Sequence, residues 1–361
     1  MEREDGGIDM QESAYWLFPR DRQGFWSNVL RDGANVQEIR LRVNRPILIR
    51  KAEGDCYLDE QGKFTGLKEE AYQFGQQEMD EMLMHLCHDS PYAFEDELRQ
   101  GFLTVPGGHR VGVAGQVVLE ENGRVRTVKH ICYMNIRFAR QILGVAEPVL
   151  PYVYQRGQMQ NCLVISPPGC GKTTLLRELV RCISEGSAYG EGLHVGVVDE
   201  RSEIAGSYLG VPQNDLGSRT DVLDACPKAL GMMMLLRSMS PQVIAVDELG
   251  DDRDVEALME AAACGSKILA TVHGTDLEDV AGRFPSLCSR RLFACVIVLG
   301  RRNGQPVIEK IYGKEEAAYA FSGRKHDTGR LPGARPMVSE PVYRKNPGDA
   351  QACIPFGDAY E

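Results

Sequence analysis

Small, cationic and hydroxyl-bearing residues gather between positions 166 and 174, in a spacing that suits phosphate binding. The run reads Ser166-Pro167-Pro168-Gly169-Cys170-Gly171-Lys172-Thr173-Thr174. A loop of this kind points successive backbone N–H groups at one spot, at the positive end of the helix that follows. We expect Lys172 to reach the β- and γ-phosphates of ATP and the Thr173 hydroxyl to ligate Mg²⁺.

The loop departs at one position from the pattern G-x-x-x-x-G-K-[ST], because Ser166 stands where the first glycine is usual. Serine is small and leaves the other backbone amides of the loop unchanged. The competing interpretation is a chance Gly-Lys-Thr in a glycine-rich turn. An apolar run before the loop and a helical pattern after it favour the phosphate-binding interpretation.

Carboxylates follow two other apolar runs and supply the remaining chemistry. Asp247 comes directly after a run of four apolar residues and is expected to hold Mg²⁺, directly or through water. The adjacent Glu248 could orient and deprotonate an attacking water. Asp199 and Glu200 end a further apolar run and add carboxylates to this set.

The second half of the chain alternates apolar runs with helical patterns, as a parallel sheet with helices on both faces requires. Ligands of such sheets bind at the carboxyl ends of the strands, so the polar residues there should converge. Thr271 and His273, at the end of another apolar run, belong to this set. We predict an α/β fold: a RecA-like phosphate-loop ATPase core, with a mostly parallel sheet, preceded by a small α+β N-terminal domain.

Composition shifts divide the chain into five parts. We expect a disordered acidic N-terminus over residues 1–13 and a largely disordered tail over 314–361. Between them we place an α+β domain at 14–143, a linker at 144–151 and the ATPase core at 152–313. Within the first domain, arginines alternate with apolar residues in the pattern of a half-buried strand with a basic outer face.

The net charge and composition of the chain limit which classes of function are expected. The net charge of −10 and pI near 5.4 disfavour a protein whose main task is coating nucleic acid or an anionic membrane. The N-terminus has no apolar core and no run approaches the ~18 apolar residues of a membrane span. The 11 Cys, without a C-x-x-C pair, are typical of reduced thiols. We therefore expect a cytoplasmic protein.

Several motifs together resemble the ATPases of type II and type IV secretion and of pili. They are the phosphate loop, the acidic box Asp199–Glu203, the run Leu236-Arg-Ser-Met-Ser-Pro241 leading into Asp247-Glu248, and Ala-Thr-Val-His273-Gly. Within this group the chain is more specifically similar to the stage III sporulation protein AA family. That likeness rests on Glu38–Pro46, Gly108–Gly115, Asn135–Arg140 and Asp199–Gly206, and runs from about residue 30 to 312.

The resemblance implies an ATP-hydrolysing motor, expected to form a hexamer, that powers or gates a channel between mother cell and forespore. Its expected partners are further copies of itself and membrane proteins of the sporulation channel, with no direct nucleic-acid contact. It implies that Arg137 and Arg140 reach the nucleotide of a neighbouring subunit, and that His273 senses the γ-phosphate. The secretion relatives use a carboxylate of the acidic box as base, so Glu200 and Glu248 both remain candidates.

Two other functions share the phosphate loop. A RecA-like ATPase acting on nucleic acid is the main alternative, although the acidic balance disfavours it. A small-molecule kinase is the other, and Glu248 argues against it because this residue favours water as the acceptor.

Overall fold

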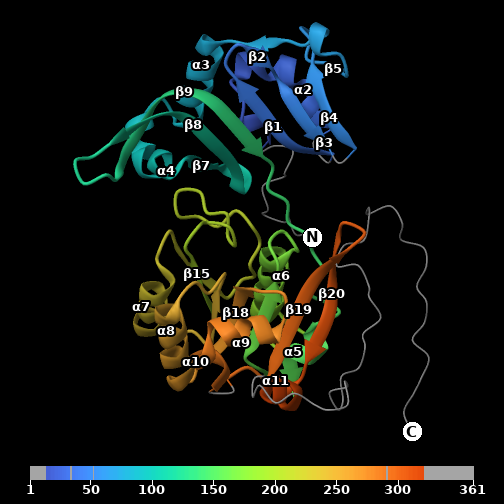
Figure 1. Cartoon of the computed structure of the whole chain (residues 1–361), viewed down its shortest axis with the longest axis vertical. Coiled ribbons are helices and arrows are strands. Elements are labelled where there is room, and N and C mark those ends of the chain that lie inside the picture. The colour runs from blue at the N-terminus through green and yellow to red at the C-terminus, as the bar shows by residue number, and fades with distance from the viewer. Residues whose placement is uncertain (1–13, 33–34, 52, 290–291, 321–361) are drawn as a thin grey trace, which may run out of the picture. The chain divides into compact units, whose positions relative to one another are not determined.

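The computed structural model describes residues 14–32, 35–51, 53–289 and 292–320, which form two compact units (Figure 1). The first unit extends to Gln141 and also takes in two later segments, Asp199–Leu216 and Val222–Cys226. The second unit holds Ile142–Val198, Gly217–Asp221 and the chain from Pro227 onward. The acidic-box segment Asp199–Leu216 therefore groups with the first unit. The sequence analysis placed these residues in the ATPase core, at 152–313. The N-terminal residues 1–13 lie outside the described residues.

A seven-stranded antiparallel sheet frames the first unit. In spatial order its strands are β5 (Phe64–Thr65), β4 (Gly54–Leu58), β3 (Leu48–Lys51), β1 (Val36–Arg42), β9 (Val125–Arg137), β8 (His109–Leu119) and β7 (Phe102–Val105). Two short strands, β2 (Arg45–Pro46) and β6 (Gln73–Phe74), pair with each other. The turn between β8 and β9 contains Gly123 at φ +80°, which glycine reaches without strain.

One face of this sheet is apolar and packs against helices. Ile39 and Leu41 of β1 are fully buried, in one core with residues of the helices α2 (Gln23–Arg31), α3 (Gln76–Leu86) and α4 (Glu95–Gln100). Pro19 immediately precedes a short turn η1 (Arg20–Arg22), which comes before α2. Two further 3₁₀ turns, η2 (Lys68–Glu70) and η3 (Pro91–Phe94), join elements, and η4 (Pro106–Gly108) precedes β8.

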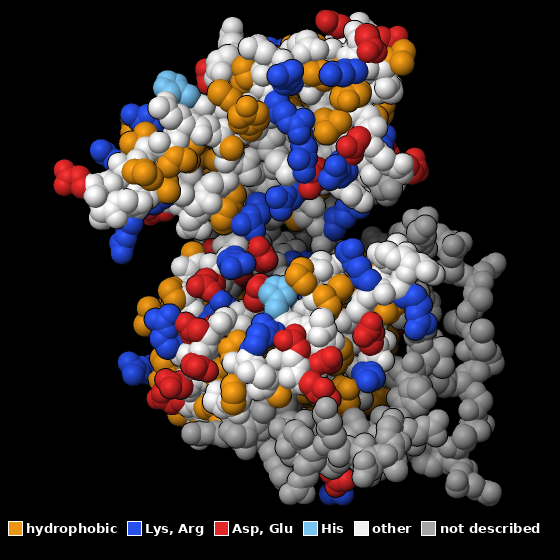
Figure 2. Space-filling view, viewed as in Figure 1, with side chains coloured by type: hydrophobic (Ala, Val, Ile, Leu, Met, Phe, Trp, Pro, Cys, Tyr) orange, Lys and Arg blue, Asp and Glu red, His pale blue; other side chains and the backbone are white. Residues whose placement is uncertain are grey.

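The opposite face of the sheet carries arginines. Register places Arg50 and Arg137 on either side of Glu38, and Arg110 beside Arg137. Figure 2 shows Lys and Arg side chains aligned over the visible face of this unit. The pleat that buries the apolar residues of β1 therefore turns its arginines outward, as the alternation in the sequence predicts.

A second seven-stranded sheet organises the second unit. In spatial order its strands are β16 (Thr220–Asp224), β15 (Val195–Asp199), β17 (Val243–Val246), β18 (Lys267–His273), β12 (Cys162–Ser166), β19 (Cys295–Arg302) and β20 (Gln305–Tyr312). The pairs from β15 through β19 are parallel, and β20 is antiparallel to β19. Two small hairpins accompany the sheet, β10 (Tyr154–Gln155) with β11 (Gln158–Met159), and β13 (Gly186–Ser187) with β14 (Gly190–Glu191).

Helices precede, separate and follow the strands of this sheet along the chain. They are α5 (Leu150–Val153), α6 (Lys172–Glu185), α7 (Lys228–Ser238), α8 (Asp252–Ala263), α9 (Leu277–Arg283), α10 (Pro285–Ser289) and α11 (Lys314–Ala320). The Asp251 carboxylate caps α8 by accepting from the backbone N–H groups of Arg253 and Asp254. Helix α11 corrects the predicted tail, because residues 314–320 are ordered in a helix; residues 321–361 lie outside the described residues.

No helix in the described part of the chain is long and apolar enough to cross a membrane.

Candidate nucleotide-binding site

The loop between β12 and α6 has the backbone that a phosphate-binding loop requires. Gly169 and Gly171 adopt φ values of +70° and +83°, in the left-handed region that glycine reaches without strain. Ser166 is the last residue of β12, is fully buried and pairs in register with His273 of β18. Strand backbone suits any residue, so the position where glycine is usual tolerates serine here.

Lys172 and Thr173, the first two residues of α6, both contact Asp247 at the end of β17. The Lys172 ammonium lies 2.9 Å from Asp247 Oδ1 and 3.5 Å from Glu248 Oε2. The Thr173 hydroxyl donates to Asp247 Oδ2 at 2.6 Å. The cation of the loop, the hydroxyl and the two carboxylates predicted as site residues are therefore one connected group.

Asp247 stays ionised despite its position. Burial by itself would raise its pKa, but the charge of Lys172 and hydrogen bonds from Thr173 and Thr271 hold the pKa below its usual value. The side chain is 14% exposed. A buried carboxylate beside a threonine hydroxyl offers the oxygen ligands that Mg²⁺ prefers, so Thr173 and Asp247 fit the predicted metal.

Glu248 contacts the predicted histidine. His273 Nε2 lies 2.8 Å from Glu248 Oε1, and His273 Nδ1 lies 3.3 Å from the Ser166 carbonyl oxygen. Glu248 has φ +53°, which is unusual for a residue with a Cβ and typical of functional sites when the surrounding structure imposes it. Here its backbone N–H donates to Thr271 Oγ1 at 2.8 Å. His273 is thus a partner of the candidate base.

Three further residues contact this site. Thr271, expected with His273 at a polar strand end, has a hydroxyl that donates to Asp247 Oδ1. The other two are arginines that the sequence analysis did not single out. Arg301 donates to the Gly169 carbonyl oxygen at 2.7 Å, and Arg283 donates to the His273 carbonyl oxygen. No pattern links Arg301 to Gly169, because only the pairing of β19 with β12 brings them together.

The acidic box lies in the first unit and has structural contacts of its own. The Asp199 carboxylate accepts from the backbone N–H groups of Glu203, Ile204 and Ala205, at 2.9, 3.0 and 2.8 Å. Burial raises the pKa of Asp199 to about 6, even though these hydrogen bonds act in the opposite direction. Glu203 pairs with Arg110 at 2.8 Å, and Glu200 is exposed. The role of Glu200 as base stays a prediction.

The two predicted arginines differ in their surroundings. Arg137 ends β9 with its side chain 60% exposed, and its Nε lies 3.9 Å from Glu38. Arg140 is exposed as a residue, but its guanidinium donates to the Val36 carbonyl oxygen at 2.7 Å, and partial burial of this group lowers its pKa. The Arg137 side chain is therefore largely exposed, whereas the Arg140 guanidinium donates to a carbonyl within its own unit.

The fold is similar to those of a pilus motor and a bacterial ATPase. The pilus retraction motor PilT with bound ADP is 16% identical, with a TM-score of 0.56, over 82% of this chain and 85% of that chain. The Legionella pneumophila ATPase DotB is 16% identical, with a TM-score of 0.51, over 90% of this chain and 87% of that one. At this identity the likeness shows a shared fold.

Sequence relatives show the family to which the chain belongs. The family model for sporulation stage III, protein AA, matches residues 15–318. Stage III sporulation protein AA of Bacillus subtilis (strain 168) is 45% identical over 284 residues, 78% of this chain and 87% of that protein. Protein SEEDLING PLASTID DEVELOPMENT 1 of Arabidopsis thaliana is 30% identical over 43% of this chain and 22% of its own length. The chain belongs to the sporulation stage III, protein AA family.

Proposed function

We propose that this protein is a Mg²⁺-dependent ATPase that hydrolyses ATP to ADP and phosphate. The observation that carries the proposal is the junction of Lys172, Thr173 and Asp247 at the start of α6. Lys172 is held by two carboxylates at a point where triphosphate oxygens could replace them. Asp247 is kept ionised beside a hydroxyl, which is the arrangement a metal-binding carboxylate needs.

Each residue has a distinct part in this proposal. The loop amides and Lys172 bind the phosphates, and Thr173 with Asp247 would hold Mg²⁺, which neutralises charge on the phosphate oxygens. Glu248 orients the attacking water and accepts its proton. His273 holds the Glu248 carboxylate in place and, since it also contacts the end of β12, can report the state of the loop.

The protein acts in this proposal as an oligomeric motor, with a hexamer as the expected form. Arg137, on the exposed sheet face, reaches the nucleotide of a neighbouring copy; Arg140 is the weaker candidate because its guanidinium already binds a carbonyl. Family membership supports a role in sporulation, where ATP turnover powers or gates a secretion-like channel between mother cell and forespore. Membrane proteins of that channel are the expected partners, and a cytoplasmic position at the membrane follows.

The test is phosphate release by the purified full chain with ATP and Mg²⁺. Lys172→Ala is the matched control, because it removes the cation of the phosphate loop while the rest of the loop sequence is unchanged. Turnover by the native chain and none by the variant supports the proposal. Equal rates for both proteins would refute it, and measuring particle size with and without nucleotide tests the oligomer.

The arginine-bearing sheet face favours one second function, ATP hydrolysis coupled to single-stranded nucleic acid. Tyr133, 54% exposed on β9, adds a ring on which a base could stack. Two of the arginines, Arg40 and Arg50, are paired with carboxylates at 2.8 and 3.0 Å, which weakens this candidate. Stimulation of ATP turnover by single-stranded DNA or RNA would favour it over a protein-channel motor.

A further inference from the structure

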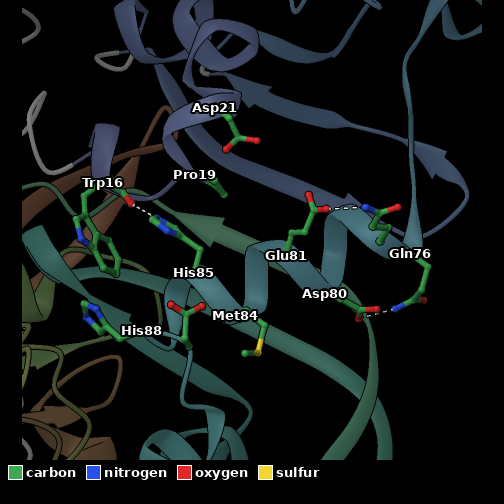
Figure 3. Close-up of a pocket in the computed structure, with 11 residues that line it drawn as sticks. Trp16, Pro19, Asp21, Gln76, Asp80, Glu81, Met84, His85 and His88 are labelled. Carbon is green, nitrogen blue, oxygen red and sulfur yellow. Dashed lines mark hydrogen bonds between the residues drawn. The ribbon is translucent and has the colours of Figure 1, made fainter.

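A groove in the first unit lies between helix α3 and the segment that leads into η1 (Figure 3). It has a volume of about 810 Å³. Trp16, Pro19 and Met84 supply its apolar surface, and the Met84 side chain is 38% exposed. The groove is therefore a mixed surface that a chain segment, rather than water alone, could cover.

Four exposed carboxylates line this groove together with the apolar residues, and no Lys or Arg does. Asp80 and Glu81 are oriented by Gln76 and Gln77, whose amides donate to them at 2.9 and 2.8 Å. Arg22, outside the groove, approaches Glu81 only to 3.8 Å. The other two carboxylates, Asp21 and Asp89, have no side-chain hydrogen bond or ion pair within the described residues. The potential of the groove is thus negative.

Trp16 forms a fixed wall of the groove. His85 Nε2 lies 2.7 Å from the Trp16 carbonyl oxygen, a contact drawn in Figure 3. The indole ring packs 5.2 Å from the His85 ring and 5.3 Å from the His88 ring, measured between centroids. An indole face held in this way beside carboxylates can accept a cation and also pack against proline.

A single metal ion does not suit this arrangement. No group of three or more His, Cys, Asp or Glu side chains in the described residues is placed to hold one. Carboxylates spread along one helix and the segment opposite instead complement a ligand whose positive charges are spread along a chain. The matching ligand is a cationic peptide with some apolar or proline residues.

The chain itself contains such a peptide, in the part that follows Ala320. Between residues 324 and 345 there are six Lys or Arg and only two Asp or Glu, against a net charge of −10 for the whole chain. Its centre, Arg330 to Val338, contains two arginines, two prolines and the apolar residues Leu331 and Met337. Proline-containing segments favour the extended PPII conformation that aromatic grooves bind.

We propose that the groove lined by Trp16 and the four carboxylates binds the segment Arg330 to Val338 of the same chain. Arg330 and Arg335 contact the carboxylates, and the prolines pack on Trp16. The contact is independent of the proposed ATPase activity, so its failure would leave that proposal untouched. The family match ends at residue 318, which makes the segment a feature outside the matched region.

Fluorescence of the full chain tests this proposal because the protein has only two tryptophans. Trp26→Phe leaves Trp16 as the sole indole reporter; Trp26 is buried and stacks on Phe18, so the smaller ring keeps an apolar contact. In this background, Arg330→Gln with Arg335→Gln should shift the Trp16 emission to the red and increase its quenching by acrylamide. Added NaCl should produce the same shift, since it screens the ion pairs.

Two further variants decide the specificity of the effect. Arg344→Gln with Lys345→Gln removes the same charge from the same tail and should leave Trp16 unchanged. Asp80→Asn with Glu81→Gln should reproduce the shift, and combining it with the Arg330 and Arg335 changes should add little, as expected for groups that act on each other. The proposal fails if the Arg330 and Arg335 changes leave Trp16 unaffected or act no more than the control pair. A shift that depends on protein concentration would place the segment on a second copy and overturn the in-chain contact.

Discussion

His273 Nε2 lies 2.8 Å from Glu248 Oε1, and this contact joins the ends of two neighbouring strands, β17 and β18. Glu248 also lies 3.5 Å from the Lys172 ammonium. The candidate base therefore has one partner in the phosphate loop and another on the next strand. A carboxylate restrained in this way is better suited to orient water than an exposed one.

The base is predicted to be Glu248. Glu248→Gln keeps the shape of the side chain but removes its ability to accept a proton, so turnover should fall by about 10²- to 10⁴-fold. Binding of a fluorescent ATP analogue should remain, because the loop and Lys172 are untouched. Glu200→Gln, measured in the same assay, should retain most turnover. The assignment is wrong if Glu200→Gln loses activity while Glu248→Gln keeps it.

Thr271 is predicted to matter although it need not touch nucleotide. Its hydroxyl donates to Asp247 and accepts from the Glu248 N–H, so it positions both carboxylates at once. Thr271→Val removes these bonds at nearly constant volume and should lower turnover by roughly 10- to 100-fold. It should also weaken Mg²⁺ binding, so the Mg²⁺ concentration that gives the half-maximal rate should rise. Thr271→Ser, which keeps the hydroxyl, should retain most of the activity. Equal rates for Thr271→Val and Thr271→Ser would contradict the role of the hydroxyl.

Arg137 is predicted to act on a neighbouring copy. Arg137→Ala should abolish most turnover with little change in thermal midpoint, since the side chain is 60% exposed. Mixed with Lys172→Ala, which is inactive for a different reason, it should recover part of the activity, because a mixed oligomer contains sites with an intact loop and an intact arginine. Arg124→Ala, at an exposed position on the adjoining hairpin, is the control and should behave as the native chain. Absence of any recovery in the mixture argues against action between copies.

The ends of parallel strands are easier to place from the sequence than the grouping of segments into units. The loop, Asp247, Glu248 and His273 each follow an apolar run, and parallel pairing brings the ends of such runs together whatever the loops do. The acidic-box segment is different, because its place depends on contacts far apart in sequence. Arg110 with Glu203, and the Gly107 N–H with Gln213 at 2.9 Å, tie it to the first unit. Neither pair leaves a periodic signal, so the segment was predicted in the ATPase core.

The Arg110–Glu203 pair is predicted to keep the acidic-box segment attached to the first unit. The Arg110 guanidinium also lies 3.7 Å above the Phe102 ring, so its removal loses two contacts. Arg110→Ala should increase hydrogen exchange at the amides of residues 203–206, read by mass spectrometry. Arg99→Ala, which removes a different exposed arginine of the same unit, should not. Unchanged exchange in the Arg110 variant would show that the remaining hydrogen bonds suffice.

Asp199 is predicted to make the stability of the chain depend on pH. Its folded pKa of about 6 lies above the ordinary value of 3.8, because burial disfavours the charge. The folded state then binds more protons than the unfolded state between these values, so this contribution to stability is full at low pH and is lost as pH rises toward 6. The loss amounts to about 3 kcal/mol at most.

Asp199→Asn cannot ionise and should lack this contribution. The thermal midpoint of the native chain, relative to that of Asp199→Asn, should therefore fall as pH rises from 4 to 7. Because the comparison is a difference at each pH, titration of the other carboxylates largely cancels. Asp221→Asn, a change of the same kind at an exposed position, should show a nearly constant difference from the native chain. A constant difference for Asp199→Asn as well would mean that the three backbone N–H groups, and not burial, decide the charge of this carboxylate.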